Sequence, residues 1–191
     1  MENIVLENIS ISYQDRPIIK NLSLQIPFGQ TTAILGSSGA GKTSLINSLM
    51  GLTPFEGKIS GLKGKKLSAV FQEDRLIEDL GLLKNISIVS PASEGEIKSH
   101  IQEIGLSGEA SKKAGKLSGG MKRRTAILRA ILAEPDIIIM DEPFKGLDEQ
   151  TKILTMAYVK KYTQGKTLIL VTHDRSEIEY FSCQKILDLS E

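Results

Sequence analysis

The sequence has no tryptophan, two histidines and one cysteine among its 191 residues. A single cysteine, Cys183, excludes an intrachain disulfide framework, and no cysteine–histidine cluster has the spacing of a zinc site. We interpret Cys183 as buried apolar filler. An excess of charge of one sign is missing too, because 24 lysines and arginines balance 23 aspartates and glutamates. This balance gives no indication of a nucleic-acid partner.

Long apolar runs are also absent. No stretch of the sequence approaches the roughly 18 apolar residues that cross a membrane. The first four residues contain neither the basic nor the apolar segment of a secretion signal. We therefore expect a cytoplasmic chain. The 40% hydrophobic and 25% charged residues are typical of a globular protein, and the length favours one domain, 1–191.

Short β-branched runs alternate with helical stretches, which is typical of βαβ units on a buried parallel sheet. The apolar runs 137–140 and 167–171 flank a periodic segment from about 148 to 162. Near the start, 4–13 and 22–26 alternate apolar and polar residues around a turn signal at 15–17, which predicts a small antiparallel sheet. We predict an α/β fold with an antiparallel β part (about 1–30), a core with a mainly parallel sheet (31–79 and 117–191) and a short helical insertion (80–116).

A glycine-rich loop follows the strand-like run 31–35 and precedes a helical run that starts at Ser44. Its sequence, Gly36-Ser37-Ser38-Gly39-Ala40-Gly41-Lys42-Thr43, matches the phosphate-binding pattern G-x-x-x-x-G-K-[ST]. Glycines let backbone N–H groups turn toward phosphate oxygens, and the helix adds the positive end of its dipole. Lys42 supplies charge for the β- and γ-phosphates, and the Thr43 hydroxyl suits Mg²⁺. The loop therefore predicts a P-loop NTPase core that binds a nucleotide polyphosphate through residues 36–44.

Two acids follow the apolar run 137–140. Such a strand is buried, so Asp141 and Glu142 emerge at the carboxyl edge of the sheet, where α/β proteins bind their ligands. Asp141 suits Mg²⁺, directly or through water, and Glu142 can orient or deprotonate an attacking water. The alternative interpretation is a pair of solvated loop acids.

A second candidate anion site precedes a predicted helix over 122–132. Ser118 is a favourable N-cap, and Gly119 and Gly120 leave the first backbone N–H groups uncovered. The alternative is an ordinary capped helix after a glycine turn. The residues alone do not decide whether both anion sites meet one nucleotide.

These segments together resemble the ATP-binding cassette (ABC) ATPases along essentially the whole chain. Leu117-Ser118-Gly119-Gly120 is similar to the family's signature motif, Asp141-Glu142-Pro143 to the end of Walker B, and Gly146-Leu147-Asp148 to the D-loop. The resemblance implies that Gln72 is the Q-loop residue near Mg²⁺ and the γ-phosphate, that His173 is the switch histidine, and that Tyr13 stacks on adenine. The alternatives are a polar strand-end residue for Gln72, a structural histidine for His173 and plain packing for Tyr13.

The resemblance also implies a head-to-tail dimer, of this chain or with a similar cassette. ATP would lie between the phosphate loop of one subunit and Ser118, Gly119 and Gly120 of the other, and closure of the dimer would couple hydrolysis to movement. Such an ATPase is peripheral on the inner face of the membrane and drives transport through separate permease subunits, with a solute-binding protein as a further partner. Residues 71–76 and 84–86 look most like importers of nitrate, sulfonates and taurine.

Two other function classes remain open at this point. An ATP-gated module that regulates a non-transport complex would carry the same motifs, and a small-molecule P-loop kinase would release a phosphorylated product. The sequence also departs from the family pattern. Met121 replaces a glutamine after the signature, and Lys145-Gly146 replaces a small Ser-Ala pair in the D-loop. Only 18 residues follow His173, so we expect no regulatory C-terminal domain.

Overall fold

Five parallel strands form the centre of the structure, in the order β5-β6-β7-β3-β8. A computed structural model describes residues 3–14, 16–37 and 39–189 of the chain. All four ladders between these strands are parallel, which confirms the predicted mainly parallel sheet. The strands are β3 (Thr31–Leu35), β5 (Leu67–Val70), β6 (Ile137–Asp141), β7 (Thr167–Val171) and β8 (Lys185–Asp188).

A second, antiparallel sheet has the order β2-β1-β4. Its strands are β1 (Asn3–Tyr13), β2 (Arg16–Pro27) and β4 (Glu56–Ser60). The predicted small antiparallel sheet is therefore confirmed, but β2 begins at Arg16 and includes Pro17, which the sequence pattern placed in the turn. Because β2 is an edge strand, the missing N–H of a proline there need not cost a ladder hydrogen bond.

Strand β4 belongs to the antiparallel sheet, although the sequence pattern assigned residues 31–79 to the core. Five residues of mixed polarity carry too weak a pattern to predict this pairing. Gly57 allows it, because a Cβ atom at this position would lie 2.5 Å from the carbonyl oxygens of Glu7 and Asn8 in β1. Only glycine lets the two backbones approach so closely.

The parallel sheet is buried on both faces. On β6, Ile137 and Ile139 pack in one core with the antiparallel sheet and helix α1 (Lys42–Leu49). Ile138 and Met140 point the other way, into a core shared with the remaining helices. This alternation explains why β6 is a continuous apolar run, as is typical of a parallel strand covered on both sides.

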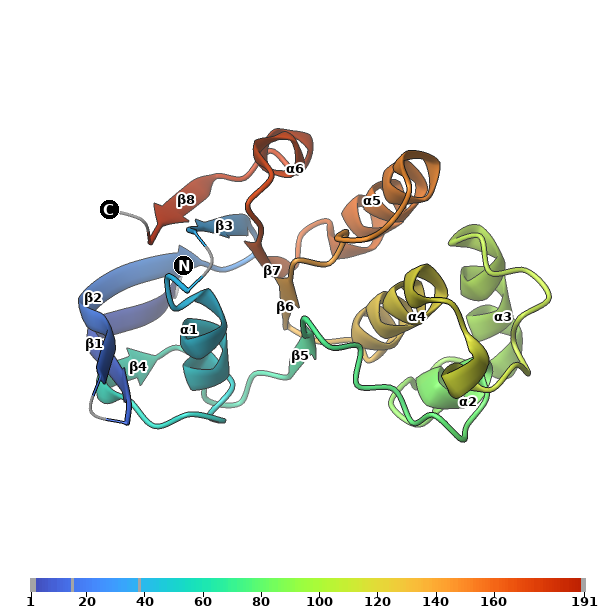
Figure 1. Cartoon of the computed structure of the whole chain (residues 1–191), viewed down its shortest axis with the longest axis horizontal. Coiled ribbons are helices and arrows are strands. Elements are labelled where there is room, and N and C mark those ends of the chain that lie inside the picture. Colours follow the sequence, from blue (N-terminus) through green and yellow to red (C-terminus); the bar gives the residue numbers. More distant parts are fainter. Residues whose placement is uncertain (1–2, 15, 38, 190–191) are drawn as a thin grey trace.

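The helices on the second face reach away from the antiparallel sheet, and α2 and α3 lie at the opposite end of the molecule (Figure 1). Helices α4 and α5 confirm the two helices predicted around 122–132 and 148–162. Among the described residues, no helix has the length and apolar character needed to cross a bilayer. The elements are α2 (Leu82–Ser87), α3 (Glu94–Glu103), the 3₁₀ turn η1 (Ala114–Lys116), α4 (Gly119–Leu132), α5 (Glu149–Thr163) and α6 (Arg175–Tyr180).

Asn85 of α2 fixes the path of the chain as it enters the helical insertion. Its side chain is 1% exposed. The Oδ1 atom accepts a hydrogen bond of 2.8 Å from the backbone N–H of Ile77. The Nδ2 atom donates to the carbonyl oxygens of Ile77, Leu80 and Gly81 at 3.1, 3.3 and 3.2 Å. One buried amide side chain therefore supplies hydrogen-bond partners for the backbone polar groups of this turn.

We expect Asn85→Ala to lower the free energy of unfolding by about 2 kcal/mol, because it leaves buried backbone groups without partners. Urea denaturation followed by circular dichroism measures this change. Gln102→Ala is the matched control, since Gln102 is an exposed amide on α3. Equal unfolding midpoints for the two variants would show that Asn85 does not have this structural role.

Candidate functional site

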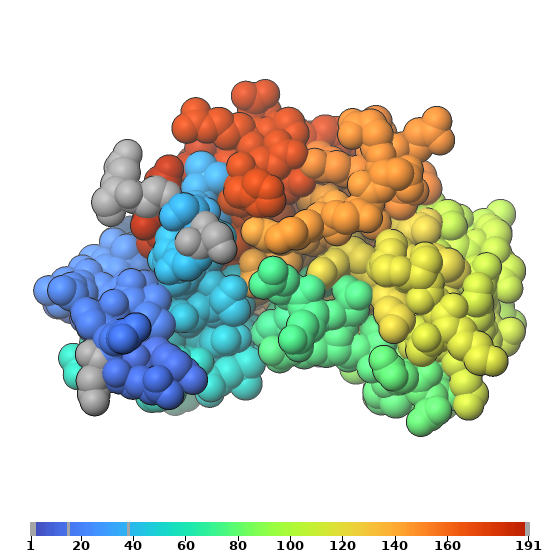
Figure 2. All heavy atoms as spheres, viewed as in Figure 1, coloured from blue at the N-terminus to red at the C-terminus, as the bar shows by residue number. Residues whose placement is uncertain are grey.

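Loops from four neighbouring strands meet at one edge of the parallel sheet. Strands β5, β6, β7 and β3 are parallel, so their carboxyl ends share an edge, where α/β sheets bind ligands. The loops there enclose a cleft of about 650 Å³. In Figure 2, the light blue phosphate loop lies beside the orange segment after β6 and the green segment after β5. The cleft is lined by Ile18, Gly36, Ser37, Gly39, Gly41, Lys42, Thr43, Ser44, Gln72, Asp141, Glu142, Lys145 and His173.

The phosphate loop has a backbone that turns tightly before α1. Gly41 precedes the helix with φ of 90°, and a Cβ atom there would lie 2.7 Å from a methyl group of Ile18. The side chain of Lys42 is directed back over the loop, where Nζ donates to the carbonyl oxygens of Gly36 and Ser37 at 2.6 and 2.8 Å. The ammonium therefore lies at the centre of the loop, where a polyphosphate binds in such motifs.

Thr43 and Asp141 bring two oxygen donors together below the phosphate loop. The Thr43 hydroxyl donates to Oδ2 of Asp141 at 3.0 Å, which joins the start of α1 to the end of β6. Burial raises the pKa of Asp141, and the hydrogen bond from Thr43 partly offsets this effect. Among the described residues no cluster of three or more His, Cys, Asp or Glu side chains could hold a metal. Thr43 and Asp141 supply two hard oxygen donors, and phosphate oxygens would supply further ligands. This combination fits Mg²⁺.

Glu142 lies one residue beyond β6, with φ of 45°, a conformation that is uncommon outside glycine. Its Oε1 atom lies 3.2 Å from Nδ1 of His173, and its Oε2 atom lies 2.7 Å from Nζ of Lys145. Burial alone would raise the pKa of Glu142, but Lys145 and His173 together hold this pKa below its usual value. The carboxylate is therefore ionised near neutral pH and directed into the cleft.

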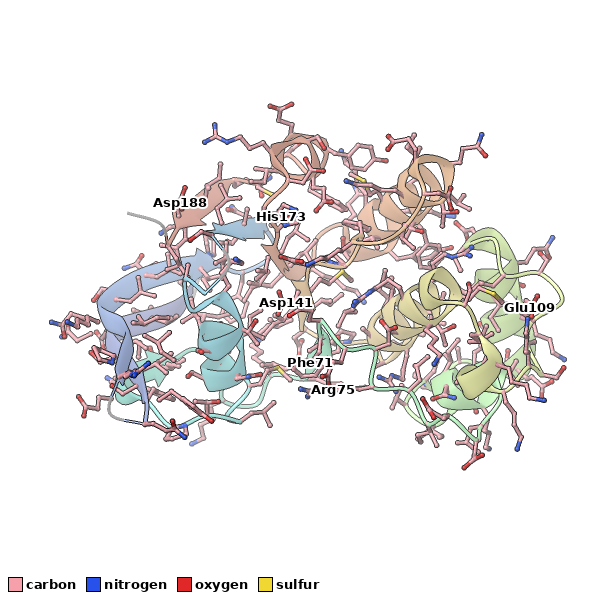
Figure 3. All side chains as sticks on the ribbon, in the orientation of Figure 1. Phe71, Arg75, Glu109, Asp141, His173 and Asp188 are labelled. Carbon is pink, nitrogen blue, oxygen red and sulfur yellow. The ribbon has the colours of Figure 1, made fainter. Side chains whose placement is uncertain are left out.

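The loop that carries His173 is held from behind by Lys152 of α5. Nζ of Lys152 lies 2.7 Å from Oδ2 of Asp174 and 2.8 Å from Oε1 of Glu177. The hydroxyl of Thr172 donates to Oε2 of Glu177 at 2.6 Å. The hydrogen bonds from Lys152 and Ser176 lower the pKa of Asp174 to about 2. This network fixes the backbone on both sides of His173, whose imidazole lies at the cleft near Asp141 (Figure 3).

Gln72 enters the cleft from a segment that α4 holds in place. Arg123 donates to the carbonyl oxygens of Phe71 and Gln72, both at 2.6 Å. Six residues further along α4, Arg129 donates to the carbonyl oxygens of Arg75 and Asp74 at 2.8 and 3.1 Å. The Arg75 guanidinium stacks over the Phe71 ring at 3.7 Å, and Figure 3 shows this pair below Asp141.

Of the predicted site residues that the structure describes, six do not line this cleft. Tyr13 lies at the end of β1 and is 67% exposed, and Ala40 lies in the phosphate loop outside the lining. Ser38 lies outside the described residues. The other four are Ser118, Gly119, Gly120 and Asp148.

The signature segment forms an exposed helix start. The hydroxyl of Ser118 accepts a hydrogen bond of 3.3 Å from the backbone N–H of Met121, which confirms the predicted N-cap. Gly119 begins α4, and a Cβ atom there would meet nothing within 4 Å. Asp148 caps α5 in the same way, by accepting from the backbone N–H of Thr151 at 3.0 Å. Both capping residues lie outside the cleft.

Two lining residues, Ile18 and Lys145, were not predicted as site residues. Ile18 reaches the cleft from β2, and no local sequence signal marks it, because its place depends on the hairpin register. In the sequence, Lys145 stands out only as a departure from the family's D-loop pattern. Its three-residue spacing from Glu142 was the available signal, since a tight turn brings such a pair together.

A phosphate loop after β3, acids at the end of β6 and a parallel sheet with helices define a P-loop nucleoside triphosphatase. A family model for the ABC transporter matches residues 19–145. The chain belongs to the ABC transporter family. It is an ATP-binding, ATP-hydrolysing subunit that uses ATP with Mg²⁺.

Individual relatives agree with this assignment. The chain is 33% identical to an aliphatic sulfonates import ATP-binding protein of Paracoccus denitrificans, over 91% of this chain and 74% of the relative. It is 32% identical to the ATP-binding protein of the intermembrane phospholipid transport system of Escherichia coli, over the same shares. A bacterial ABC transporter cassette solved as a dimer superposes with a TM-score of 0.86 and 28% identity, over 98% of this chain and 94% of that one. A post-hydrolysis state bound to ADP and Pi gives a TM-score of 0.85 and 26% identity over the same shares.

Proposed function

We propose that two copies of this chain close head to tail on two ATP molecules and that hydrolysis reopens them. The observation that carries this proposal is that the predicted site residues lie in two separate places on the surface. The cleft gathers the phosphate loop, Gln72, Glu142 and His173, whereas Ser118 presents an exposed helix start elsewhere on the surface. A helix start with uncovered N–H groups suits the γ-phosphate of a nucleotide held by a second subunit. The solved dimers of similar cassettes support this arrangement.

Within one cleft, each side chain has a chemical task that its geometry supports. Lys42 and the backbone of 36–44 bind the phosphates, and Glu142 orients the attacking water and accepts its proton. His173, 3.2 Å from Glu142, would contact the γ-phosphate and the base together. Thr43, Asp141 and Gln72 would hold Mg²⁺, which neutralises charge that develops on the phosphates. Tyr13 as the adenine platform stays a prediction.

We further propose that this ATPase powers an importer through separate permease subunits, on the inner face of the membrane. Support comes from the relatives named for aliphatic sulfonate import. A solute-binding protein would be a further subunit. The permease and that protein select the solute, because the cleft of this chain has the chemistry of a nucleotide site alone.

The experiment for this proposal is a pull-down of natively expressed protein from gently solubilised membranes, followed by mass spectrometry. We expect a multi-span permease in stoichiometric amount, because a peripheral motor must be attached to the subunit it moves. The detergent extract of cells that lack the chain is the control. Reproducible recovery with soluble partners alone would contradict the transport proposal and favour an ATP-gated regulatory module, while leaving the nucleotide chemistry unchanged.

A further inference from the structure

Lys145 has no part in the tasks described above, yet its ammonium lies against the proposed base. Its backbone N–H bonds to the carbonyl oxygen of Glu142 at 3.3 Å, which closes a tight turn after β6. This turn returns the lysine side chain to the cleft, where Nζ lies 2.7 Å from Oε2 of Glu142. The short sequence distance between the two residues therefore gives a short distance in space.

The turn that carries Lys145 is firmly anchored. Phe144 is 2% exposed, and its ring stacks on Phe181 with centroids 5.7 Å apart. The backbone N–H of Glu142 donates to the carbonyl oxygen of Val171 at 2.9 Å, which ties the turn to β7. Pro143 is also buried, and its ring restricts the backbone of the turn further. The backbone of Lys145 is therefore held in place, and its ammonium group needs only to reach the adjacent carboxylate of Glu142.

The Glu142 carboxylate is held on both oxygens by groups from different loops. His173 contacts Oε1 from the loop after β7, and Lys145 contacts Oε2 from the turn after β6. The terminal torsion of a glutamate is intrinsically broad, so a single contact would leave the plane of the carboxylate undetermined. Two opposed contacts define this plane, and the side chain of Glu142 is only 14% exposed.

Lys145 also separates the nucleotide cleft from a second cavity of about 300 Å³. That cavity lies between the D-loop and the His173 loop, and it contains the acids Asp174 and Glu177. Lys152 forms ion pairs with both of these acids, whereas Lys145 forms its ion pair with Glu142. Lys145 therefore lies where the two cavities meet, with its side chain 55% exposed and its ammonium on the carboxylate of Glu142.

We propose that Lys145 is a positioning residue for ATP hydrolysis. Its ammonium holds the carboxylate of Glu142 in the orientation from which that group addresses the attacking water. Lys145 acts through Glu142 alone, so the inference rests on the proposed role of Glu142 as the base. Correct orientation of a reacting group is a large part of catalytic rate, and its loss lowers kcat without loss of substrate binding.

The test is steady-state hydrolysis of ATP by the full chain and its variants. Lys145→Met keeps the aliphatic stem and loses the charge, and we expect kcat to fall about tenfold while KM for ATP changes less than about twofold. Lys145→Arg keeps the charge, and we expect it to restore kcat to within about twofold of the wild type. Lys112→Met is the matched control, because Lys112 pairs with Glu109 at 3.0 Å with the same three-residue spacing, away from the cleft.

The outcomes separate this inference from the role of Glu142. If Glu142→Gln hydrolyses ATP at the wild-type rate, the proposed base is wrong and the inference about Lys145 falls with it. If Glu142→Gln is inactive while Lys145→Met keeps the wild-type kcat, only the inference about Lys145 is overturned. It is overturned equally if Lys145→Arg is as slow as Lys145→Met, or if the loss appears in KM alone. Adding Lys145→Met to Glu142→Gln should cause no further loss of rate.

Discussion

Glu142→Gln is expected to lower the rate of ATP hydrolysis by about 10² to 10⁴-fold and to accumulate an ATP-bound dimer. The range is that of a positioned general base, and the amide keeps the shape of the carboxylate while losing its basicity. Binding is spared, because Lys42 and the phosphate loop are untouched. The dimer persists, since only hydrolysis removes the nucleotide that stabilises the closed state. Light scattering coupled to size exclusion, with MgATP in the buffer, measures the dimer fraction.

Ser118→Arg in the Glu142→Gln background is the decisive companion variant. Ser118 is exposed at the start of α4 and lies outside the cleft of its own chain, so nucleotide binding by the monomer should remain. An arginine there blocks the approach of a second subunit, and we expect the ATP-dependent dimer to disappear. A dimer that survives this change would contradict the proposal that each ATP site is divided between two subunits. Equal dimer fractions for wild type and Glu142→Gln would contradict it as well.

Lys42→Ala is expected to weaken ATP binding by about 10 to 100-fold. The variant removes a charged hydrogen-bond donor to the phosphates, worth about 1.5–3 kcal/mol, which corresponds to this range of dissociation constants. It also removes the two bonds that Nζ makes to the loop carbonyl oxygens of Gly36 and Ser37. Isothermal titration calorimetry with MgATP measures the change.

Lys98→Ala is the control for Lys42→Ala. Lys98 forms an exposed ion pair of 2.6 Å with Glu94 on α3, away from the cleft, so its loss should leave the dissociation constant unchanged. Circular dichroism of both variants establishes that each is folded. An unaltered affinity in a folded Lys42→Ala protein would show that this lysine does not bind the phosphates.

The chemistry at the sheet edge could be predicted because each of its parts is local in the sequence. The phosphate loop occupies eight consecutive residues, 36–43, and Asp141 and Glu142 directly follow an apolar strand. Such segments carry their own signal, and parallel strand topology then brings the loops to one edge. The bond between Thr43 and Asp141 follows from that topology, although 98 residues separate the two in the chain.

Other features depend on contacts that no local pattern encodes. Strand β4 pairs with β1 through a close approach at Gly57, and its five residues resemble a polar loop. Ile18 reaches the cleft only because the register of β1 and β2 places it there. The ion pair of Lys145 with Glu142 needs the geometry of the turn after β6. Sequence periodicity reports burial and element type, and these features are set by register and turn geometry instead.

The two arginines of α4 determine which parts of this molecule can move separately. Arg123 and Arg129 fasten the backbone of 71–75 to one side of α4 through four hydrogen bonds. An ion pair of 3.2 Å between Arg123 and Asp74 adds to them. Bending of the backbone must therefore fall outside this fastened segment. The same helix begins at Ser118, so any tilt of α4 relative to the sheet shifts Gln72 and the exposed helix start in one step.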